Sequence, residues 1–224
     1  MESTRDTEHA QWIQLMPGHS FGHTGDPVCG SLSRRVSREA DTGMIPDLTD
    51  AGLLPVGRFQ CTMDEVQRRF VSDEEFGTST TRADIWTKFK VLVARAKNEK
   101  AKIPSAFVSG TFVTSKIDPS DIDASLLVDA SRITSDQTRG KIEAAIAVAA
   151  DQFKLDVFPV WWSPEPVDGG PGALAIEANV YLRDRGLWDD LWQRNVAKAE
   201  RRPFQRHHAF PQRGYLEVMI DGYR

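Results

Sequence analysis

The residues Phe107-Val108-Ser109-Gly110-Thr111, followed ten positions later by Asp121-Ile122-Asp123, decide how this chain is expected to fold. The apolar residues 106–108 predict a buried strand that breaks at the Ser-Gly pair, and residues 111–115 predict a short helix. Amide groups at the start of such a helix favour an anion. A second strand is expected over residues 121–129, with Asp121 and Asp123 on one face and Ile122 on the other.

Two carboxylates this close together repel each other unless a cation lies between them. An Asp-x-Asp pair alone is more often a solvated strand end than a metal site. A third acid strengthens the metal interpretation, because Asp156 is the only charge in the apolar run of residues 155–162. Burying a lone carboxylate is costly unless it is paired or bound to a metal. A salt bridge, or a place at the exposed start of the strand, stays open for Asp156.

The remaining pattern predicts an α/β fold with a mixed sheet and flanking helices. Thr62 and Glu65 form a capping box, an amphipathic helix is expected over residues 81–100, and Ser135 is expected to cap a helix that crosses over to the strand at 155–162. Towards the C-terminus, the pattern predicts a strand at 173–182, a helix around 187–200 and a last strand at 215–220. Residues 1–43 lack any period and predict a flexible tail before a single domain at 44–224.

Composition predicts an ordinary globular chain. It has 224 residues, 40% hydrophobic and 27% charged, which is enough for one core. Its apolar runs are far shorter than the roughly 20 residues that span a bilayer, and its start lacks a signal peptide's apolar run, so we expect a cytoplasmic protein without a membrane partner. Cys29 and Cys61 form no metal spacing or disulfide framework. A net charge of −4 disfavours broad nucleic-acid binding.

The most basic part of the chain lies near its C-terminus. It carries two tryptophans and seven cationic residues: Arg183, Arg185, Arg194, Lys198, Arg201, Arg202 and Arg206. One interpretation is a surface for a triphosphate or a polynucleotide. The other is a solvated helix whose charges pair with neighbouring acids, which is the commoner meaning of a mixed charge run.

The spacing of these motifs resembles the nucleotidyltransferase superfamily that includes DNA polymerase beta. The signature of that superfamily is Gly-Ser, a spacer, Asp-x-Asp and a third acid on a later strand, and here Gly110-Thr111, Asp121-Ile122-Asp123 and Asp156 match it. Residues 44–165 are similar, more narrowly, to a family of uncharacterised bacterial nucleotidyltransferase-like proteins. One departure is visible, because Thr111 stands where serine is usual. The hydroxyl group is retained there.

The resemblance implies a metal-dependent transfer of a nucleoside monophosphate from a nucleoside triphosphate to an acceptor hydroxyl. Asp121, Asp123 and Asp156 would hold two Mg²⁺ or Mn²⁺ ions, and Asp156 would also help to activate the attacking hydroxyl. The triphosphate would contact Ser109, Gly110, Thr111 and Lys116. The acceptor stays open between a small molecule, RNA and protein. A catalytically weak nucleotide-binding protein, or the regulatory half of a toxin and antitoxin pair, is the alternative.

Overall fold

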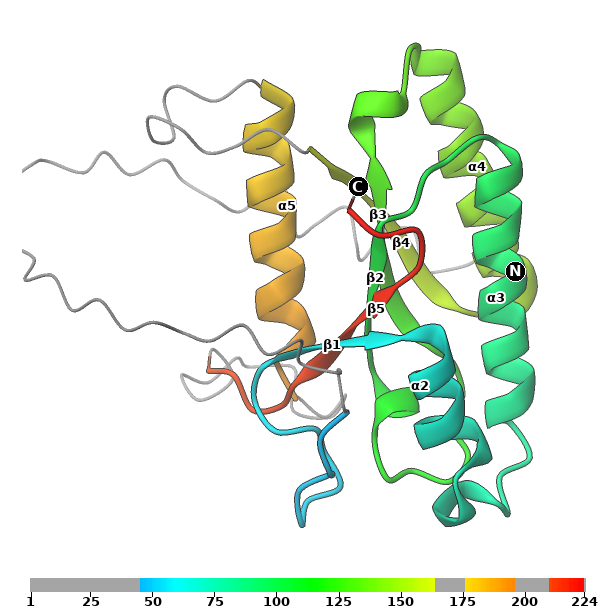
Figure 1. The fold of residues 1–224 in the computed structure, drawn as a ribbon, viewed down its shortest axis with the longest axis vertical. Helices are drawn as coiled ribbons and strands as arrows, with labels where there is room; N and C mark the ends of the chain where they lie inside the picture. Colours follow the sequence, from blue (N-terminus) through cyan, green and yellow to red (C-terminus); the bar gives the residue numbers. More distant parts are fainter. Residues whose placement is uncertain (1–44, 164–175, 196–209, 224) are drawn as a thin grey trace, which may run out of the picture. The chain divides into compact units, whose positions relative to one another are not determined.

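The computed structural model describes residues 45–163, 176–195 and 210–223 (Figure 1). The described residues form a five-stranded sheet in the order β1-β5-β2-β3-β4. β1 runs parallel to β5 and β3 runs parallel to β4, whereas β2 is antiparallel to both β5 and β3. The strands are β1 Arg58–Thr62, β2 Ser105–Ser109, β3 Asp123–Asp129, β4 Asp156–Trp162 and β5 Tyr215–Met219. The predicted α/β class and mixed sheet are confirmed. The expected tail at 1–43 lies outside the described residues.

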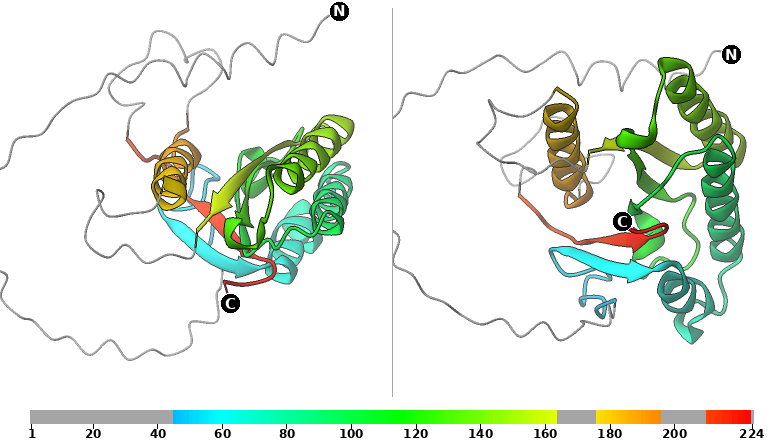
Figure 2. Two further views of the ribbon diagram at one scale, coloured as in Figure 1. Left: turned by 90° about the horizontal axis from the view of Figure 1, so that it is seen from above. Right: turned by 45° about the horizontal axis from the view of Figure 1, so that its top comes forward.

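Helices cover both faces of the sheet (Figure 2). One face packs on α3 and α4, and the other packs on α5. The helices are α2 Met63–Gln67, α3 Arg82–Asn98, α4 Asp136–Phe153 and α5 Ile176–Trp192, and short helical turns follow α2 at Arg68–Ser72 and Glu74–Phe76, follow β2 at Thr111–Val113 and follow β3 at Ala130–Arg132. No helix in these described segments is long and apolar enough to cross a membrane.

Local sequence signals explain where these helices begin and end. Thr62 accepts a hydrogen bond from the Glu65 amide while the Glu65 carboxylate accepts one from the Thr62 amide, which is the predicted capping box. Ser135 caps α4 by accepting from the Thr138 amide. That helix ends where Lys154 turns left-handed at φ 58°, and β4 begins two residues later. α4 is therefore the predicted crossover between the parallel strands β3 and β4.

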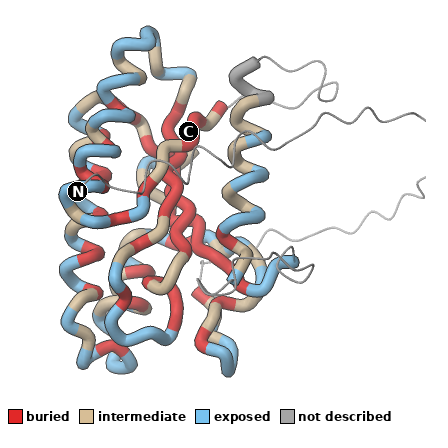
Figure 3. Tube along the Cα trace, turned by 180° about the vertical axis from the view of Figure 1, so that it is seen from behind, coloured by how far each residue is buried: buried red, intermediate tan, exposed pale blue. Residues whose placement is uncertain are grey.

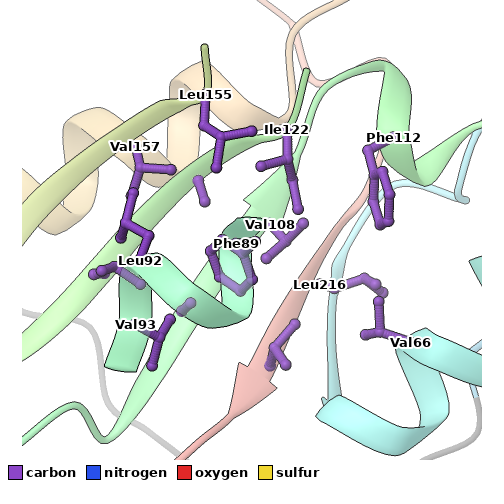
Figure 4. Close-up of a cluster of buried hydrophobic side chains, with 14 of the residues drawn as sticks. Val66, Phe89, Leu92, Val93, Val108, Phe112, Ile122, Leu155, Val157 and Leu216 are labelled. Atoms are coloured by element: carbon purple, nitrogen blue, oxygen red, sulfur yellow. The ribbon is translucent and has the colours of Figure 1, made fainter. Parts of the chain in front are cut away.

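The main core lies between the sheet and the pair α3 and α4. Figure 3 shows buried residues concentrated along the strands and the inner sides of these helices. Figure 4 shows apolar side chains of the strands and of α3 in one cluster, among them Phe89, Leu92, Val108 and Val157. Because successive strand residues alternate between faces, Ala124 in β3 and Val157 in β4 belong to this core, and their neighbours Asp123 and Asp156 face α5.

The C-terminal prediction needs correction. Residues 176–182, expected in a strand, belong to α5, and this helix ends at Trp192 instead of continuing to residue 200. Residues 173–175 and 196–200 lie outside the described segments. The apolar residues of this stretch fit either period over a few positions, but Trp188 and Trp192, four residues apart, share one helical face and stack on each other. β1 was not predicted, and the last strand was predicted without its position between β1 and β2.

Candidate functional site

Two of the predicted acids begin neighbouring strands. Asp123 is the first residue of β3 and Asp156 the first of β4, and they are partners in the parallel register. Their Cα atoms therefore stand about 4.8 Å apart, with both side chains on the α5 face. The Asp156 amide donates to the Ile122 carbonyl oxygen at 3.0 Å, which fixes this register. The structure therefore brings these two carboxylates together at one end of the sheet.

Asp156 is exposed and Asp123 is half-buried. The reason given from sequence for a functional Asp156, a lone charge buried in an apolar strand, was therefore wrong. The exposed strand start, which the sequence left open, is what the structure has. A carboxylate at a solvated strand end needs no partner to exist there. Its place beside Asp123 is now the argument for a functional role.

Asp121 lies outside the strand, because β3 begins two residues later than predicted. It is half-buried and accepts a hydrogen bond from the Ser120 hydroxyl at 3.2 Å, while Ile122 between the two acids is fully buried. The strand parity used to align Asp121 with Asp123 therefore does not apply. Within the described segments, no group of three His, Cys, Asp or Glu side chains is arranged to hold a metal ion.

Gly110 allows the Asp123 carboxylate to lie directly against the turn after β2. A Cβ atom at this position would stand 1.6 Å from Asp123 Oδ2, closer than any non-bonded contact. The residue also has φ +72°, which L side chains rarely adopt. Only glycine satisfies both conditions without a local shift. The glycine of the predicted phosphate turn thus has a structural reason in this chain.

The other predicted nucleotide contacts differ from one another. Thr111 begins the helical turn after Gly110, and its Oγ1 atom is buried without a hydrogen-bond partner in the described structure. Ser109 is instead engaged, because its hydroxyl donates to the Trp192 carbonyl oxygen at 3.1 Å. Lys116 is exposed, in the loop before β3. The orphaned hydroxyl of Thr111 is the group best suited to receive a ligand atom, since such groups are rare in native interiors.

A buried arginine that the sequence did not single out holds the loop that contains Lys116. Arg82, at the start of α3, is 1% exposed. Its guanidinium donates to backbone carbonyl oxygens at distances between 2.5 and 3.1 Å, those of Phe70, Phe112, Thr114, Lys116 and Ile117. Burial lowers the pKa of Arg82 to about 10. Arg82 therefore fixes the course of the chain on both sides of Lys116.

Asp118 ties the same loop to the start of α3. Its carboxylate accepts hydrogen bonds from the Thr80 amide at 2.7 Å and from the hydroxyls of Ser79 and Thr80 at 3.2 Å. These donors, the Thr80 amide first, hold the pKa of Asp118 below its ordinary value. The loop that follows the predicted anion turn is thus held to the start of α3 by two charged side chains, Arg82 and Asp118.

Arg213 is the second buried arginine at the site, and it too was missed. It is 5% exposed and lies just before β5. Its Nη2 donates to the Gly110 carbonyl oxygen at 2.8 Å. Burial lowers the pKa of Arg213, and the nearby negative charge of Asp123 acts in the opposite direction. Nothing local marks this residue in the sequence, because a long connection after β4 separates it from the acids.

Residues 46–219 match the profile of a family whose description reads "Family of unknown function (DUF6932)". The chain belongs to this family. No curated protein and no solved structure gives a significant match.

α5 packs its aromatic side chains beside the acids of this DUF6932 chain. Trp188 stacks on Phe158 with ring centroids 4.9 Å apart and on Trp192 with centroids 5.1 Å apart. Trp192 Nε1 donates to the Ser125 hydroxyl at 3.0 Å. Phe158 and Ser125 each lie two residues beyond a site aspartate on the same face. α5 therefore forms one wall of the site.

The basic region near α5 is described only in part. Arg183 pairs with Asp184 at 2.9 Å, and Arg194 pairs with Asp190. These pairs favour the solvated-helix interpretation for the described portion. The predicted cationic positions Lys198, Arg201, Arg202 and Arg206 lie outside the described residues.

Asp123 and Asp156 are better placed to share a divalent cation than the predicted triad, which also includes Asp121. Two carboxylates on adjacent parallel strands are near enough to share an ion with bonds of about 2.1 Å. The unpartnered Thr111 hydroxyl and the glycine required at position 110 leave an oxygen-rich end of the sheet beside them. Asp121 would reach the same ion only from the loop that precedes β3.

Proposed function

We propose that this DUF6932 chain is a metal-dependent nucleotidyltransferase that acts on a nucleoside triphosphate. The observation that carries the proposal is the in-register pairing of Asp123 with Asp156, with Gly110 packed on the Asp123 carboxylate. Two carboxylates that open neighbouring strands beside a glycine turn provide the ligands for a cation and a place for phosphate. The resemblance drawn from sequence points the same way.

Asp123 and Asp156 would hold Mg²⁺ or Mn²⁺, with Asp121 contributing from the loop before β3. The cation would supply positive charge for the triphosphate and lower the pKa of an acceptor hydroxyl. The chain itself supplies the rest. The hydroxyl of Thr111 and the turn at Gly110 receive phosphate oxygens, and Lys116, exposed nearby, neutralises the departing charge.

In the proposed reaction the acceptor oxygen bonds to the α-phosphorus, and the bond from that phosphorus to the oxygen that bridges to the β-phosphate breaks. Pyrophosphate leaves and the hydroxyl proton passes to the Asp156 carboxylate. Asp156 suits this role because it is the solvent-exposed member of the pair, so that an acceptor and its proton have access to it. The acceptor class, whether a small molecule, RNA or protein, is a separate question for experiment.

A nucleotide-binding protein without transfer activity is the second candidate. It is favoured by Arg213, a resident cation near Asp123 where a metal charge would otherwise be needed. Arginine binds phosphate directly, so this arrangement would suffice for a nucleotide sensor. A regulatory partner of toxin and antitoxin type would belong to this candidate.

Incubation with α-labelled nucleoside triphosphates, Mg²⁺ or Mn²⁺, and total cellular RNA and protein separates the two candidates. Transfer of label to an acceptor, lost in Asp156→Asn, supports the enzyme. Thermal stabilisation by nucleotide without any label transfer supports the sensor. Absence of both effects would overturn nucleotide binding at this site. Asp184→Asn is the matched control, because Asp184 is a carboxylate that pairs with Arg183 on α5.

A further inference from the structure

We propose that Arg213 is an internal counter-cation for Asp123 and a positioning residue for the Gly110 turn. The inference rests on the proposed function for its meaning in catalysis, but the pairing itself is testable without metal or nucleotide. It assigns to Arg213 the task of holding the acid site together until a metal–nucleotide complex arrives.

Gly110 links Arg213 to Asp123. Gly110 is in contact with both partners, because Arg213 Nη2 donates to its carbonyl oxygen and the Asp123 carboxylate lies against its Cα. The guanidinium and the carboxylate therefore meet at one residue. A guanidinium carries five N–H donors, and the Nε donor of Arg213 makes only a long bond, to the Gly214 carbonyl oxygen at 3.5 Å. Donors are thus left for a carboxylate.

Arg213 carries its positive charge in a buried position. Arg213 is 5% exposed, and an arginine so buried is rarely left without a negative partner. Asp123 is the carboxylate whose charge acts on it. Asp123 in turn stands beside the carboxylate of Asp156 on the neighbouring strand. A resident positive charge offsets the repulsion between these two acids when no metal is bound.

Arg213 also orients the peptide between Gly110 and Thr111. A trans peptide points its carbonyl oxygen and its amide hydrogen in opposite directions. The bond from Arg213 to the Gly110 carbonyl oxygen therefore also sets the direction of the Thr111 amide, next to the unpartnered Thr111 hydroxyl. Arg213 positions the turn that would receive phosphate, and it does so without touching the reacting atoms.

A double-mutant cycle between Asp123→Asn and Arg213→Gln tests the pairing in the metal-free protein. Glutamine keeps a donor for the Gly110 carbonyl oxygen but removes the charge. By urea unfolding, Arg213→Gln should raise the unfolding equilibrium constant about tenfold more in the wild-type background than in Asp123→Asn, a coupling typical of groups in contact. Arg213→Lys, which keeps the charge, should retain most of the coupling.

The control cycle uses Arg58→Gln and Glu217→Gln. These side chains form an ion pair of 3.5 Å on the same face of the sheet, in strands away from β3 and β4. If Arg213→Gln does not fold, the effect of Asp123→Asn on the free energy of unfolding is measured in the Arg213→Lys background instead. There, Asp123→Asn should destabilise the protein by as much as it does in the wild type. Additive effects in the Asp123 cycle would overturn the pairing.

Binding of Mn²⁺ alone, measured by calorimetry, is the second readout. If Arg213 competes with metal for Asp123, Arg213→Gln should bind Mn²⁺ at least about tenfold more tightly than the wild type, as removal of a neighbouring like charge predicts. Arg58→Gln should leave the affinity unchanged. Equal or weaker Mn²⁺ binding in Arg213→Gln would overturn the competition. Absence of Mn²⁺ binding in every variant would overturn the proposed function. The pairing of Arg213 with Asp123 would then be decided by the double-mutant cycle alone.

Discussion

Gly110 joins more of the site than any other single residue, because Asp123 packs on it and Arg213 bonds to its carbonyl oxygen. We expect Gly110→Ala to raise the free energy of folding by roughly 1–3 kcal/mol, the usual cost of a non-glycine residue in a strained backbone conformation. The added Cβ must also displace the Asp123 carboxylate. The rate of nucleotide transfer, measured with label, should therefore fall by more than the loss of folded protein alone would explain.

The control for this substitution is Gly140→Ala in α4. An added Cβ at Gly140 meets no atom within 4 Å, and alanine suits a helix better than glycine by about 0.5–1 kcal/mol. Urea unfolding should show a small gain in stability with unchanged transfer. A Gly110→Ala variant as stable and as active as the wild type would show that the contact with Asp123 is not needed.

For Asp123, the structure changes the effect expected of the substitution Asp123→Asn on the stability of the metal-free protein. From sequence, Asp123 is one of two mutually repelling carboxylates, so that Asp123→Asn should leave metal-free stability unchanged or raise it. The proposed pairing with Arg213 reverses the expected sign, because the substitution would then remove the negative charge beside a buried guanidinium. No periodicity or motif joins residue 213 to residue 123, so sequence alone offered no warning.

Among the elements, the loop from the turn after β2 to Asp118 is held by the start of α3. Asp118 accepts three hydrogen bonds there, and they lower its pKa. Because the folded-state pKa is depressed, the stability that Asp118 contributes is fully present above the ordinary Asp pKa of about 3.9. It is lost as the pH falls through the lower pKa of the folded state.

We therefore expect Asp118→Asn to be less stable than the wild type at pH 7, and the difference to shrink as the pH falls below about 4. Chemical denaturation at several pH values measures both effects. Asp84→Asn is the control, since Asp84 is an exposed partner of Lys88 on α3. A difference that persists unchanged at low pH would mean that the Asp118 side chain acts by shape instead of charge.

α5 is held to the sheet by its aromatic side chains. We expect Trp188→Ala to destabilise the chain by roughly 1–3 kcal/mol, because half-buried Trp188 stacks on both Phe158 and Trp192 and the substitution removes these contacts. Leu187→Ala, at a position 54% exposed on the same helix, should change stability by less than about 0.5 kcal/mol. Thermal unfolding compares them, and equal effects would argue against α5 as a packed wall.

The elements that sequence predicted well are those with a local signal. The capping box at Thr62 and Glu65, the apolar stripe of α3 and the cap of α4 at Ser135 all occur as expected. The start of β3 was set two residues early, and residues 176–182, the first part of α5, were assigned to a strand, because short apolar runs fit both periods. Arg82 and Arg213 act through distant backbone groups, which no local pattern records.

At the scale of the whole molecule, the sheet depends on its last strand. β5 lies between β1 and β2, so that β1 joins the sheet only through it. Val218 of β5 is fully buried and is the register partner of both Cys61 in β1 and Ala106 in β2. Sequence predicted this strand but not its place between β1 and β2, because strand order is set by long-range pairing. The residues that close the sheet are thus more than a hundred positions from those they join.

Cys61 reports on the integrity of this arrangement. Its thiol is 2% exposed, and burial raises its pKa to about 12, so it should be inert to thiol reagents at pH 8 unless the chain opens. In a Cys29→Ser background, Val218→Ala should destabilise the fold by roughly 2 kcal/mol and raise the rate of Cys61 modification about thirtyfold. The thirtyfold rise is expected if β1 is released only when the whole sheet unfolds, because the rate of Cys61 modification then follows the population of unfolded protein. Val148→Ala, at an exposed position of α4, should change neither quantity.

The loss of stability, measured by tryptophan fluorescence, predicts how much the rate of Cys61 modification should rise. A larger rise than this would show that β1 separates from β5 while the acid site at the other strands stays folded.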